Sequence, residues 1–442
     1  MSGLALICAA RGARVTGSDA DPARLAELAT AGCPVRAGHD VPPPADASCV
    51  VWSTAIADDN LELVAARAAG IPVIHRAQAL QALADGRTFL AVSGTHGKSS
   101  TTGMLATILT RLGGDPSYAI GAALTETGNS ARHGGGPVLV AEADESDRSF
   151  HWLRPDVAVI TNVTDDHPEN YSGLADHVNA YVKFAGCITL GGTLVINVDD
   201  EGAGKVATRM PGSRPDLRVI TVGTGLGADW RVTAVTCTGM SSTSTVIGPD
   251  GQQLTVRLPV PGRHMASNAV AALAAAVEAG APATGAVQAL GSFGGVCGRL
   301  TLRGDQGGVR VIDSFAHHPA EIKADLEAAR VIAGDARQVI AVCQPRGYGR
   351  TLAYAAPMAA ELAAADLVAL LDICAPAWEP NPGASSQLIA DAGAGQVTSP
   401  AGAVCLVVQA ARPGDVVLIM GSGPLADQVC RALGGVLEAA RS

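Results

Sequence analysis

Short apolar runs alternate with polar turns and helix-like segments along most of the chain. In the first part, strands are predicted at 13–19, 49–53 and 71–74, and helices at 23–29 and 62–69. Beyond it, apolar runs that end in polar residues predict strands at 89–92, 138–142 and 157–162. Parallel strands end in this way at the edge of a sheet where ligands bind. The alternation therefore predicts an α/β fold built on parallel sheets.

The second half of the chain changes pattern twice. Alternating Val/Thr-rich residues between 217 and 261, with turn residues at 248–251, predict a small antiparallel insert. An alanine-rich helix follows at 268–276, and the glycine-rich segment 291–298 predicts a hinge. The remaining residues return to the α/β pattern, with strands predicted at 309–313, 339–343, 367–371 and 416–420. We predict three domains, which span residues 1–86, 87–296 and 297–442.

Composition narrows the class of protein. A chain of 442 residues is too long for one core, and 48% hydrophobic with only 3% aromatic residues predicts aliphatic, alanine-rich cores. A net charge of −10 argues against a nucleic-acid partner. The ten cysteines are scattered without a CxxC pair, which favours free thiols in a reducing cytoplasm. We expect a cytoplasmic protein with no signal peptide and no membrane insertion.

The most informative segment lies between the run 89–92 and a predicted helix at 104–109. It is rich in small and hydroxyl residues around one lysine, and it comprises Gly94, Thr95, His96, Gly97, Lys98, Ser99 and Ser100. A strand, a glycine-rich turn, Lys-Ser and a helix together bind nucleotide phosphates, because backbone N–H groups and the helix N-terminus face the anion. Lys98 would reach the β- and γ-phosphates, and the Ser99 hydroxyl would bind Mg²⁺.

This turn is shorter than the usual Walker A loop, because only two residues separate Gly94 from the Gly-Lys pair. The alternative is an ordinary glycine-rich turn with an incidental lysine. The predicted strand and helix on either side make that alternative the weaker one. We therefore predict an ATP site.

Two further strand ends carry candidate metal ligands. Four acids fall within residues 142–147, and Glu142, nearest the strand, is the predicted Mg²⁺ ligand. The alternative is a solvated acidic loop. His167, beside Asp166 at the next strand end, is a candidate ligand of a second divalent ion, although a surface histidine is the commoner case. Segments 261–268, 313–319 and 344–351 add polar residues at later strand ends, where a cleft is expected.

These motifs together resemble the Mur ligases, and among them the branch that adds alanine. The matching segments are 94–99, 141–147, 161–167, 262–264, 317–322 and 344–351. The resemblance implies a Rossmann-like first domain for the UDP substrate, a central ATP domain and a Rossmann-like third domain for the amino acid. It implies ATP- and Mg²⁺-dependent joining of L-alanine to UDP-N-acetylmuramate through an acyl phosphate, in peptidoglycan precursor synthesis, by a monomer or weak dimer.

The same resemblance implies the roles of individual residues. Asn268, Arg299 and Asp313 would contact the nucleotide. Tyr348 and Arg350 would bind the amino acid, with Arg350 pairing its carboxylate. The residues implied in catalysis are Lys98, His167, His317 and Arg350, and those implied in metal binding are Ser99, Glu142 and His167.

The chain departs from the family pattern at several positions. It opens on Met1-Ser2-Gly3, the end of a glycine-rich loop that the family places before its first helix, so we expect weak binding of the UDP substrate. Met265, Phe315 and Arg346 replace the usual asparagine, tyrosine and histidine. Two alternatives stay open: a paralogue that joins another carboxylate and amine, and a degenerate homologue that only binds nucleotide. The retained polar residues argue against degeneration.

Overall fold

One large mixed sheet runs through the middle of the molecule. In this computed structural model, which describes residues 1–21, 25–376 and 379–439 (side chains up to 435), the sheet has ten strands in the order β14-β13-β12-β11-β10-β9-β5-β8-β6-β7. Its strands are β5 (Thr88–Ser93), β6 (Ser117–Ala119), β7 (Ala131–Arg132), β8 (Val138–Glu142), β9 (Val157–Ile160), β10 (Thr193–Asn197), β11 (Arg218–Gly223), β12 (Trp230–Thr238), β13 (Ser241–Ile247) and β14 (Gln253–Leu258). The strands from β11 to β6 are parallel, and β12 to β14 pair antiparallel.

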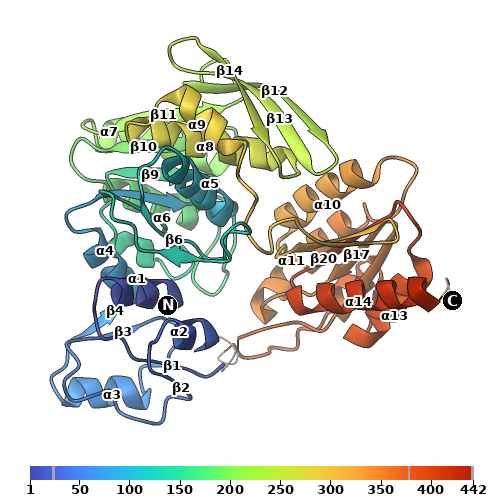
Figure 1. Cartoon of the computed structure of the whole chain (residues 1–442), viewed down its shortest axis with the longest axis horizontal. Helices are drawn as coiled ribbons and strands as arrows, with labels where there is room; N and C mark the ends of the chain where they lie inside the picture. The colour runs from blue at the N-terminus through green and yellow to red at the C-terminus, as the bar shows by residue number, and fades with distance from the viewer. Residues whose placement is uncertain (22–24, 377–378, 440–442) are drawn as a thin grey trace.

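The antiparallel strands predicted as an insert are part of this sheet. Trp230 and Arg231 of β12 pair in parallel with Val222 and Gly223 of β11, so the hairpins extend the sheet instead of standing apart. In Figure 1 they reach from the central domain toward α10 of the C-terminal part.

Alternate residues of the central strands point to opposite faces of the sheet. Leu90 and Val92 pack into one apolar core, and Phe89 and Ala91 into the other. Helices α5 (Lys98–Arg111), α8 (Arg263–Glu278) and α9 (Ala283–Leu290) cover the first face, and α6 (Leu174–Gly186) and α7 (Glu201–Ser213) the second. Both faces are buried, which explains why these strands are continuous apolar runs.

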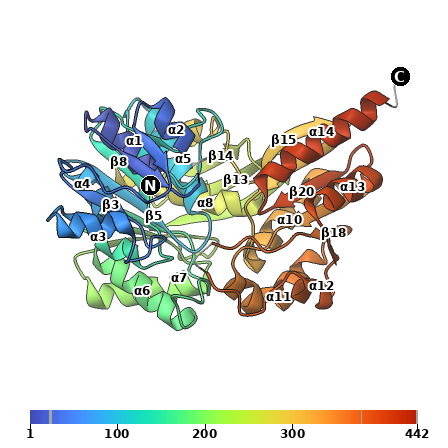
Figure 2. The same cartoon turned by 90° about the horizontal axis from the view of Figure 1, so that it is seen from below.

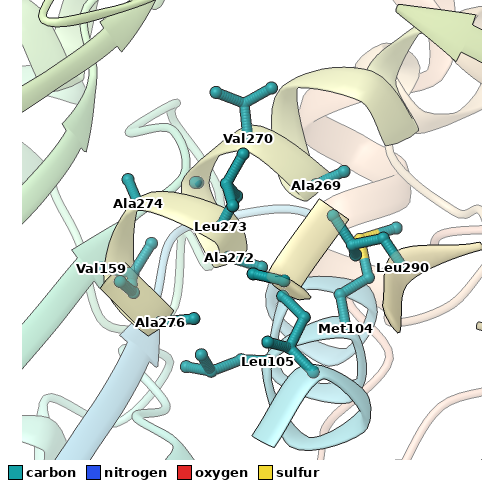
Figure 3. Packing of buried hydrophobic residues seen from close by; sticks show 14 of the residues in the cluster. Met104, Leu105, Val159, Ala269, Val270, Ala272, Leu273, Ala274, Ala276 and Leu290 are labelled. Atoms are coloured by element: carbon teal, nitrogen blue, oxygen red, sulfur yellow. The ribbon is translucent and has the colours of Figure 1, made fainter. Parts of the chain in front are cut away.

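Small side chains let α5 and α8 pack closely. Figure 3 shows Met104 and Leu105 of α5 beside the alanines of α8, with Val159 of β9 and Leu290 of α9 nearby. Met104 is fully buried, so its replacement by alanine would cost about 2–5 kcal/mol of unfolding free energy. The base of α5, which carries the predicted phosphate-binding residues, is therefore rigidly held.

The C-terminal part has its own sheet of six strands, in the order β15-β16-β20-β17-β18-β19. All neighbours are parallel except β15 and β16. The strands are β15 (Thr301–Gln306), β16 (Val309–Ser314), β17 (Val339–Cys343), β18 (Leu367–Leu370), β19 (Gln396–Val397) and β20 (Val416–Met420). One face is covered by α10 (Pro319–Ala333), α11 (Tyr348–Leu362) and α12 (Gln387–Asp391), and the other by α13 (Pro400–Ala410) and α14 (Gly423–Ala439).

The N-terminal part contains two separate two-stranded parallel sheets, β1–β2 and β3–β4. The predicted parallel pairing holds within each pair, but among the described residues no ladder joins the pairs into one sheet. The elements are α1 (Ser2–Ala10), β1 (Gly17–Asp19), α2 (Ala26–Thr30), β2 (Val35–Ala37), β3 (Val50–Trp52), α3 (Leu61–Ala68), β4 (Val73–His75) and α4 (Arg76–Ala84). The start of the predicted helix at 23–29 lies outside the described residues.

The N-terminal part packs on the central domain. Ile7 of α1 and Leu80 of α4 belong to the same apolar core as Phe150, which lies in the 3₁₀ turn Ser149–Trp152 of the central domain. Figure 2 shows α1 and α4 next to the central strands, while the C-terminal part occupies the other side. None of the helices among the described residues is long and apolar enough to span a bilayer.

Candidate active site

The loop between β5 and α5 requires glycine at two positions. Gly94 has φ 141°, and a Cβ there would collide with the Thr161 hydroxyl. Gly97 has φ 81° and caps α5, and a Cβ there would lie 2.7 Å from Asn268 Oδ1. Both glycines therefore allow the close approach of another element. Asn268, predicted to contact the nucleotide, lies directly beside the loop.

Residues at the end of β9 hold the phosphate loop in place by hydrogen bonds to the backbone of the loop. The Thr161 hydroxyl (2.6 Å) and the Asn162 amide (3.0 Å) donate to the His96 carbonyl, and the His96 N–H donates to Asn162 Oδ1 at 2.8 Å. The Thr95 hydroxyl accepts from the Thr164 N–H at 3.0 Å. The loop is therefore fixed before any ligand arrives.

The first turn of α5 has the properties of an anion site. Gly97 has no side chain to cap the helix, so the N–H groups of the first turn are left for a ligand. Ser99 and Ser100 lie in this turn and are buried. This geometry fits the phosphate binding predicted for the segment.

Lys98 is partly buried and surrounded by oxygen atoms. Its Nζ donates to the carbonyl oxygens of Gly94 (2.7 Å) and Thr95 (3.2 Å) and to Glu145 Oε1 at 2.9 Å. Burial lowers the pKa of Lys98, but the carboxylates of Glu145 and Asp144 outweigh it and raise the pKa. The lysine is therefore a fixed positive charge at the loop.

Glu145, and not the residue at the strand end, is the acid that meets this lysine. Its side chain is fully buried, its Oε2 lies 2.8 Å from Lys98 Nζ without making a hydrogen bond, and burial raises its pKa. Glu142 instead accepts a hydrogen bond from the Gly121 N–H at 2.9 Å. The sequence carried no signal for how the chain turns back after β8, and Glu142 stays the predicted Mg²⁺ ligand.

The metal-binding roles of Ser99, Glu142 and His167 stay predictions in this structure. Among the residues it describes, no group of three or more His, Cys, Asp or Glu side chains is arranged to hold a metal ion. His167 Nδ1 lies 3.0 Å from Glu169 Oε1. Burial lowers the pKa of His167, but this hydrogen bond and the charge of Asp166 outweigh it and raise the pKa. The Ser99 hydroxyl and the Glu142 carboxylate offer the oxygen atoms that Mg²⁺ takes, whereas the two oxygens of Glu145 lie 2.9 and 2.8 Å from Lys98 Nζ.

The C-terminal domain reaches the same place through an ion pair. Arg350 Nε and Nη2 donate to Asp166 Oδ1 and Oδ2 at 2.7 and 3.2 Å, and both side chains are largely buried. Arg350 holds the pKa of the Asp166 carboxyl far below its usual range, although burial opposes this. Asp165 contributes its carbonyl oxygen, which lies 3.1 Å from both His318 Nε2 and the Tyr354 hydroxyl.

The other predicted residues of this domain are arranged less closely. The guanidinium groups of Arg299 and Arg346 lie 4.9 and 4.5 Å from the centre of the Phe315 ring. Asp313 is buried in β16, and burial raises its pKa. Tyr348 is the first residue of α11. His317 Nδ1 lies 2.6 Å from the Phe315 carbonyl oxygen, and burial lowers the pKa of His317 to about 4.

The N-terminal part also contacts the acidic run. The Thr54 hydroxyl donates to Asp147 Oδ2 at 2.8 Å, and Arg76 donates to Asp144 and Asp147 at 2.8 and 3.0 Å. Sequence reasoning missed Thr54 and Arg76, and it did not predict the pairings of Glu145 with Lys98 and of Asp166 with Arg350. A lone arginine after a strand carries no signal of its own, because its partners are about 70 residues away in the chain.

A phosphate loop on the central of three α/β parts, with the other two parts contacting its edges, defines a class of multidomain nucleotide-dependent enzymes. Models of one family cover most of the chain. "Mur ligase family, catalytic domain" matches residues 1–88, "Mur ligase middle domain" matches 92–276, and "Mur ligase, glutamate ligase domain" matches 298–423. The chain belongs to the Mur ligase family, and the resemblance read from its motifs is confirmed.

Similar proteins agree with this assignment. UDP-N-acetylmuramate--L-alanine ligase of Streptomyces avermitilis is 48% identical over 97% of this chain and 93% of its own length. The ligase of the same name from Thermobifida fusca is 42% identical over 98% of this chain and 94% of its own length. The crystal structure of UDP-N-acetylmuramate-alanine ligase MurC from Thermotoga maritima has a TM-score of 0.80 at 25% identity, and covers 99% of this chain and 97% of that one. The predicted three-domain α/β fold is confirmed.

Proposed function

We propose that this protein is an ADP-forming ligase that joins L-alanine to UDP-N-acetylmuramate in peptidoglycan precursor synthesis. The observation that carries the proposal is the ion-paired Lys98 in the phosphate loop, with Arg350 of another domain on Asp166 and His317 linked to the loop through Glu321. The names of the similar ligases supply the two substrates. ATP binds at the loop of residues 94–100, with Asn268, Arg299 and Asp313 on the nucleotide side.

In the first half of the reaction, the substrate carboxylate attacks the γ-phosphorus of ATP, and ADP leaves. Both reacting groups are negative and repel each other. The positive charge of Lys98, held in place at the loop, lowers the barrier by neutralising part of the phosphate charge. Mg²⁺, when bound, neutralises further phosphate charge. Ser99 and a carboxylate of the run 142–147 would hold it, with His167 as the predicted ligand of a second ion. For the carboxylate, Glu142 is the predicted ligand, because both oxygens of Glu145 are already paired with Lys98.

In the second half, the amine of alanine attacks the acyl carbon, and phosphate leaves with the oxygen that came from the carboxylate. The amine must first lose a proton. His317 Nδ1 faces the Phe315 carbonyl, which can only accept, so this nitrogen carries the hydrogen and Nε2 keeps its lone pair. The lowered pKa keeps the ring neutral at pH 7; His317 is thus too weak a base to take a proton from an ammonium group, and its Nε2 instead accepts a hydrogen bond that orients the neutral amine.

The amino acid is bound by the C-terminal domain. Arg350 would pair the alanine carboxylate in the fork geometry that it now offers to Asp166, and Tyr348 precedes it by half a turn in α11. The UDP part of the other substrate would lie on residues 1–86, whose Thr54 and Arg76 reach the acidic run. We further propose a cytoplasmic enzyme that is a monomer or weak dimer.

ADP release with a panel of amino acids tests the proposal. With ATP, Mg²⁺ and UDP-N-acetylmuramate present, L-alanine should give the highest kcat/KM, with glycine and L-serine as the matched small competitors. A different preferred amine would identify a paralogue with another substrate. ATP binding without turnover on any member of the panel would support a degenerate nucleotide-binding homologue.

A further inference from the structure

Glu321 lies where the C-terminal domain meets the phosphate loop, and the proposed function gives it no role. It sits in the first turn of α10, one turn after the cap residue His318. Its Oε1 lies 3.1 Å from His96 Nδ1, and its Oε2 accepts the His317 N–H at 3.1 Å. One carboxylate therefore contacts a residue of the ATP loop and a residue of the amino-acid side.

The neighbours of Glu321 stabilise the negative charge of its carboxylate. Burial alone would raise the pKa of its carboxyl, but His317, His96 and Arg299 outweigh this and hold the pKa well below its usual range. The carboxylate is therefore ionised at neutral pH, and it accepts hydrogen bonds more strongly than a neutral amide would.

The His96 ring is held by residues of the C-terminal domain and by the loop that follows β9. Its backbone is fixed by β9, as described above, but its ring contacts Glu321 at Nδ1 and Thr164 Oγ1 at Nε2 (3.3 Å). The ring also lies 4.7 Å from the His318 ring. The C-terminal domain thus sets the position of a side chain that belongs to the phosphate loop.

The other oxygen of Glu321 acts on His317. It lies 3.5 Å from His317 Nδ1, the nitrogen that faces the Phe315 carbonyl, in addition to accepting the backbone N–H. A negative charge beside Nδ1 favours the tautomer in which that nitrogen carries the hydrogen. The same carboxylate that orients the loop residue therefore also favours the lone pair on His317 Nε2.

We propose that Glu321 is a positioning residue that couples the two half-sites, orienting His96 in the ATP loop with one oxygen and His317 on the amino-acid side with the other. The proposal rests on the function proposed above for His317. Its ATP arm does not depend on that function, because nucleotide binding can be measured without turnover.

Glu321→Gln tests the coupling, because it keeps the shape of the side chain and removes the charge. The matched control is Glu327→Gln, an exposed residue of the same helix with the same change in charge. In the full-length protein, we expect Glu321→Gln to weaken ATP binding about tenfold by calorimetry and to lower kcat/KM for L-alanine about tenfold, as for a lost hydrogen bond to a charged group. The control should change neither.

A double-mutant cycle separates positioning from a merely structural role. If Glu321 acts on the nucleotide through His96, adding Glu321→Gln to His96→Gln should cause no further loss of ATP affinity, while kcat/KM for L-alanine still falls. Additive losses of ATP affinity, or a Glu321→Gln variant that matches Glu327→Gln in both measurements, would overturn the proposal. If the wild type shows no alanine-dependent ADP release, the proposed function fails, and the ATP cycle still decides whether Glu321 positions the loop.

Discussion

The central domain meets its two neighbours through interfaces with different roles. On the N-terminal side, Arg76 binds Asp144 and Asp147, which flank Glu145 in the acidic run. On the C-terminal side, Arg350 binds Asp166 and Glu321 contacts His96. In the first interface, Arg76 has no direct contact with a substrate in the proposed reaction. The second interface uses the groups that are proposed to bind and orient the amino acid.

This difference indicates which interface must change during turnover. Asp166 already neutralises Arg350, so the carboxylate of an amino acid would compete with Asp166 for the guanidinium. Nothing in the proposed reaction competes for Arg76. We therefore expect the N-terminal interface to persist through the cycle, and the C-terminal interface to exchange its protein partner for substrate. The predictions that follow test this contrast, from the largest expected effect to the smallest.

Lys98 lies between the two interfaces, and its loss should have the largest effect. Lys98→Ala removes the positioned charge at the phosphates, so ADP release should fall about 1,000-fold. Lys183→Ala, at an exposed lysine of α6, is the matched control and should behave as the wild type. Turnover of the Lys98 variant within a few-fold of the wild type would remove the assignment of the phosphate loop.

Arg350→Ala should act on the amino acid. The loss of a charge-assisted, two-point contact worth about 2 kcal/mol raises KM for L-alanine about 30-fold, while ATP affinity changes little. Arg350→Lys keeps the charge but loses the two-point contact. Its KM for L-alanine should therefore lie between those of the wild type and Arg350→Ala. Steady-state kinetics with varied alanine measures the effect. An unchanged KM for alanine would show that Arg350 only joins the domains through Asp166.

Arg76→Ala should act on the nucleotide instead. Without this guanidinium, the charge of Asp144 beside Glu145 is left to repel phosphate, so ATP binding should weaken about tenfold, as for a lost hydrogen bond to a charged group. KM for alanine should not change. Calorimetry with ATP measures the effect, and Arg67→Ala, whose ion pair with Asp58 is exposed, is the control. A rise in KM for alanine instead would contradict the contrast between the interfaces.

Mild acid should weaken the C-terminal side. Burial lowers the pKa values of His317 and His318 to about 4 from 6.5. As pH falls through this window, the unfolded chain takes up protons that the folded chain does not, so unfolding free energy decreases by at most about 1.4 kcal/mol per pH unit for each histidine. Above the pKa that these histidines have in the unfolded chain, this loss of unfolding free energy is absent. Urea unfolding at several pH values measures this effect. In His317→Gln, the unfolding free energy should fall less steeply with decreasing pH than in the wild type, and an equal slope would contradict the prediction.

Much of the fold was predictable because both faces of each large sheet are buried. Strands such as β17 and β20 are continuous apolar runs, and the structure places them where the sequence predicted them, at 339–343 and 416–420. The loop of residues 94–100 could be predicted because its glycines and lysine lie within one short segment, Gly94 to Lys98. The separation of β1–β2 from β3–β4 was not, since strand pairing depends on neighbours that are distant in the chain.

The candidate site was less predictable than the fold for the same reason. Glu142 ends β8 and stays the predicted Mg²⁺ ligand, but the sequence carried no sign that the chain turns after it and brings Glu145 to Lys98. Arg350 was predicted to bind the amino acid, but the sequence did not predict its pairing with Asp166, 184 residues away, which was named only as a neighbour of His167. Contacts across an interface leave no local pattern. The roles assigned to the individual site residues stay predictions until the variants are measured.

Transfer of oxygen from substrate to phosphate tests the central claim most directly. UDP-N-acetylmuramate labelled with ¹⁸O in its carboxylate is incubated with ATP, Mg²⁺ and L-alanine, and the released phosphate is analysed by mass spectrometry. If the carboxylate attacks the γ-phosphorus and the amine then displaces phosphate, each phosphate carries one carboxylate oxygen, and UDP-N-acetylmuramoyl-L-alanine forms in equal amount. Unlabelled phosphate, released together with ADP, would contradict the acyl-phosphate ligase that the site is proposed to be.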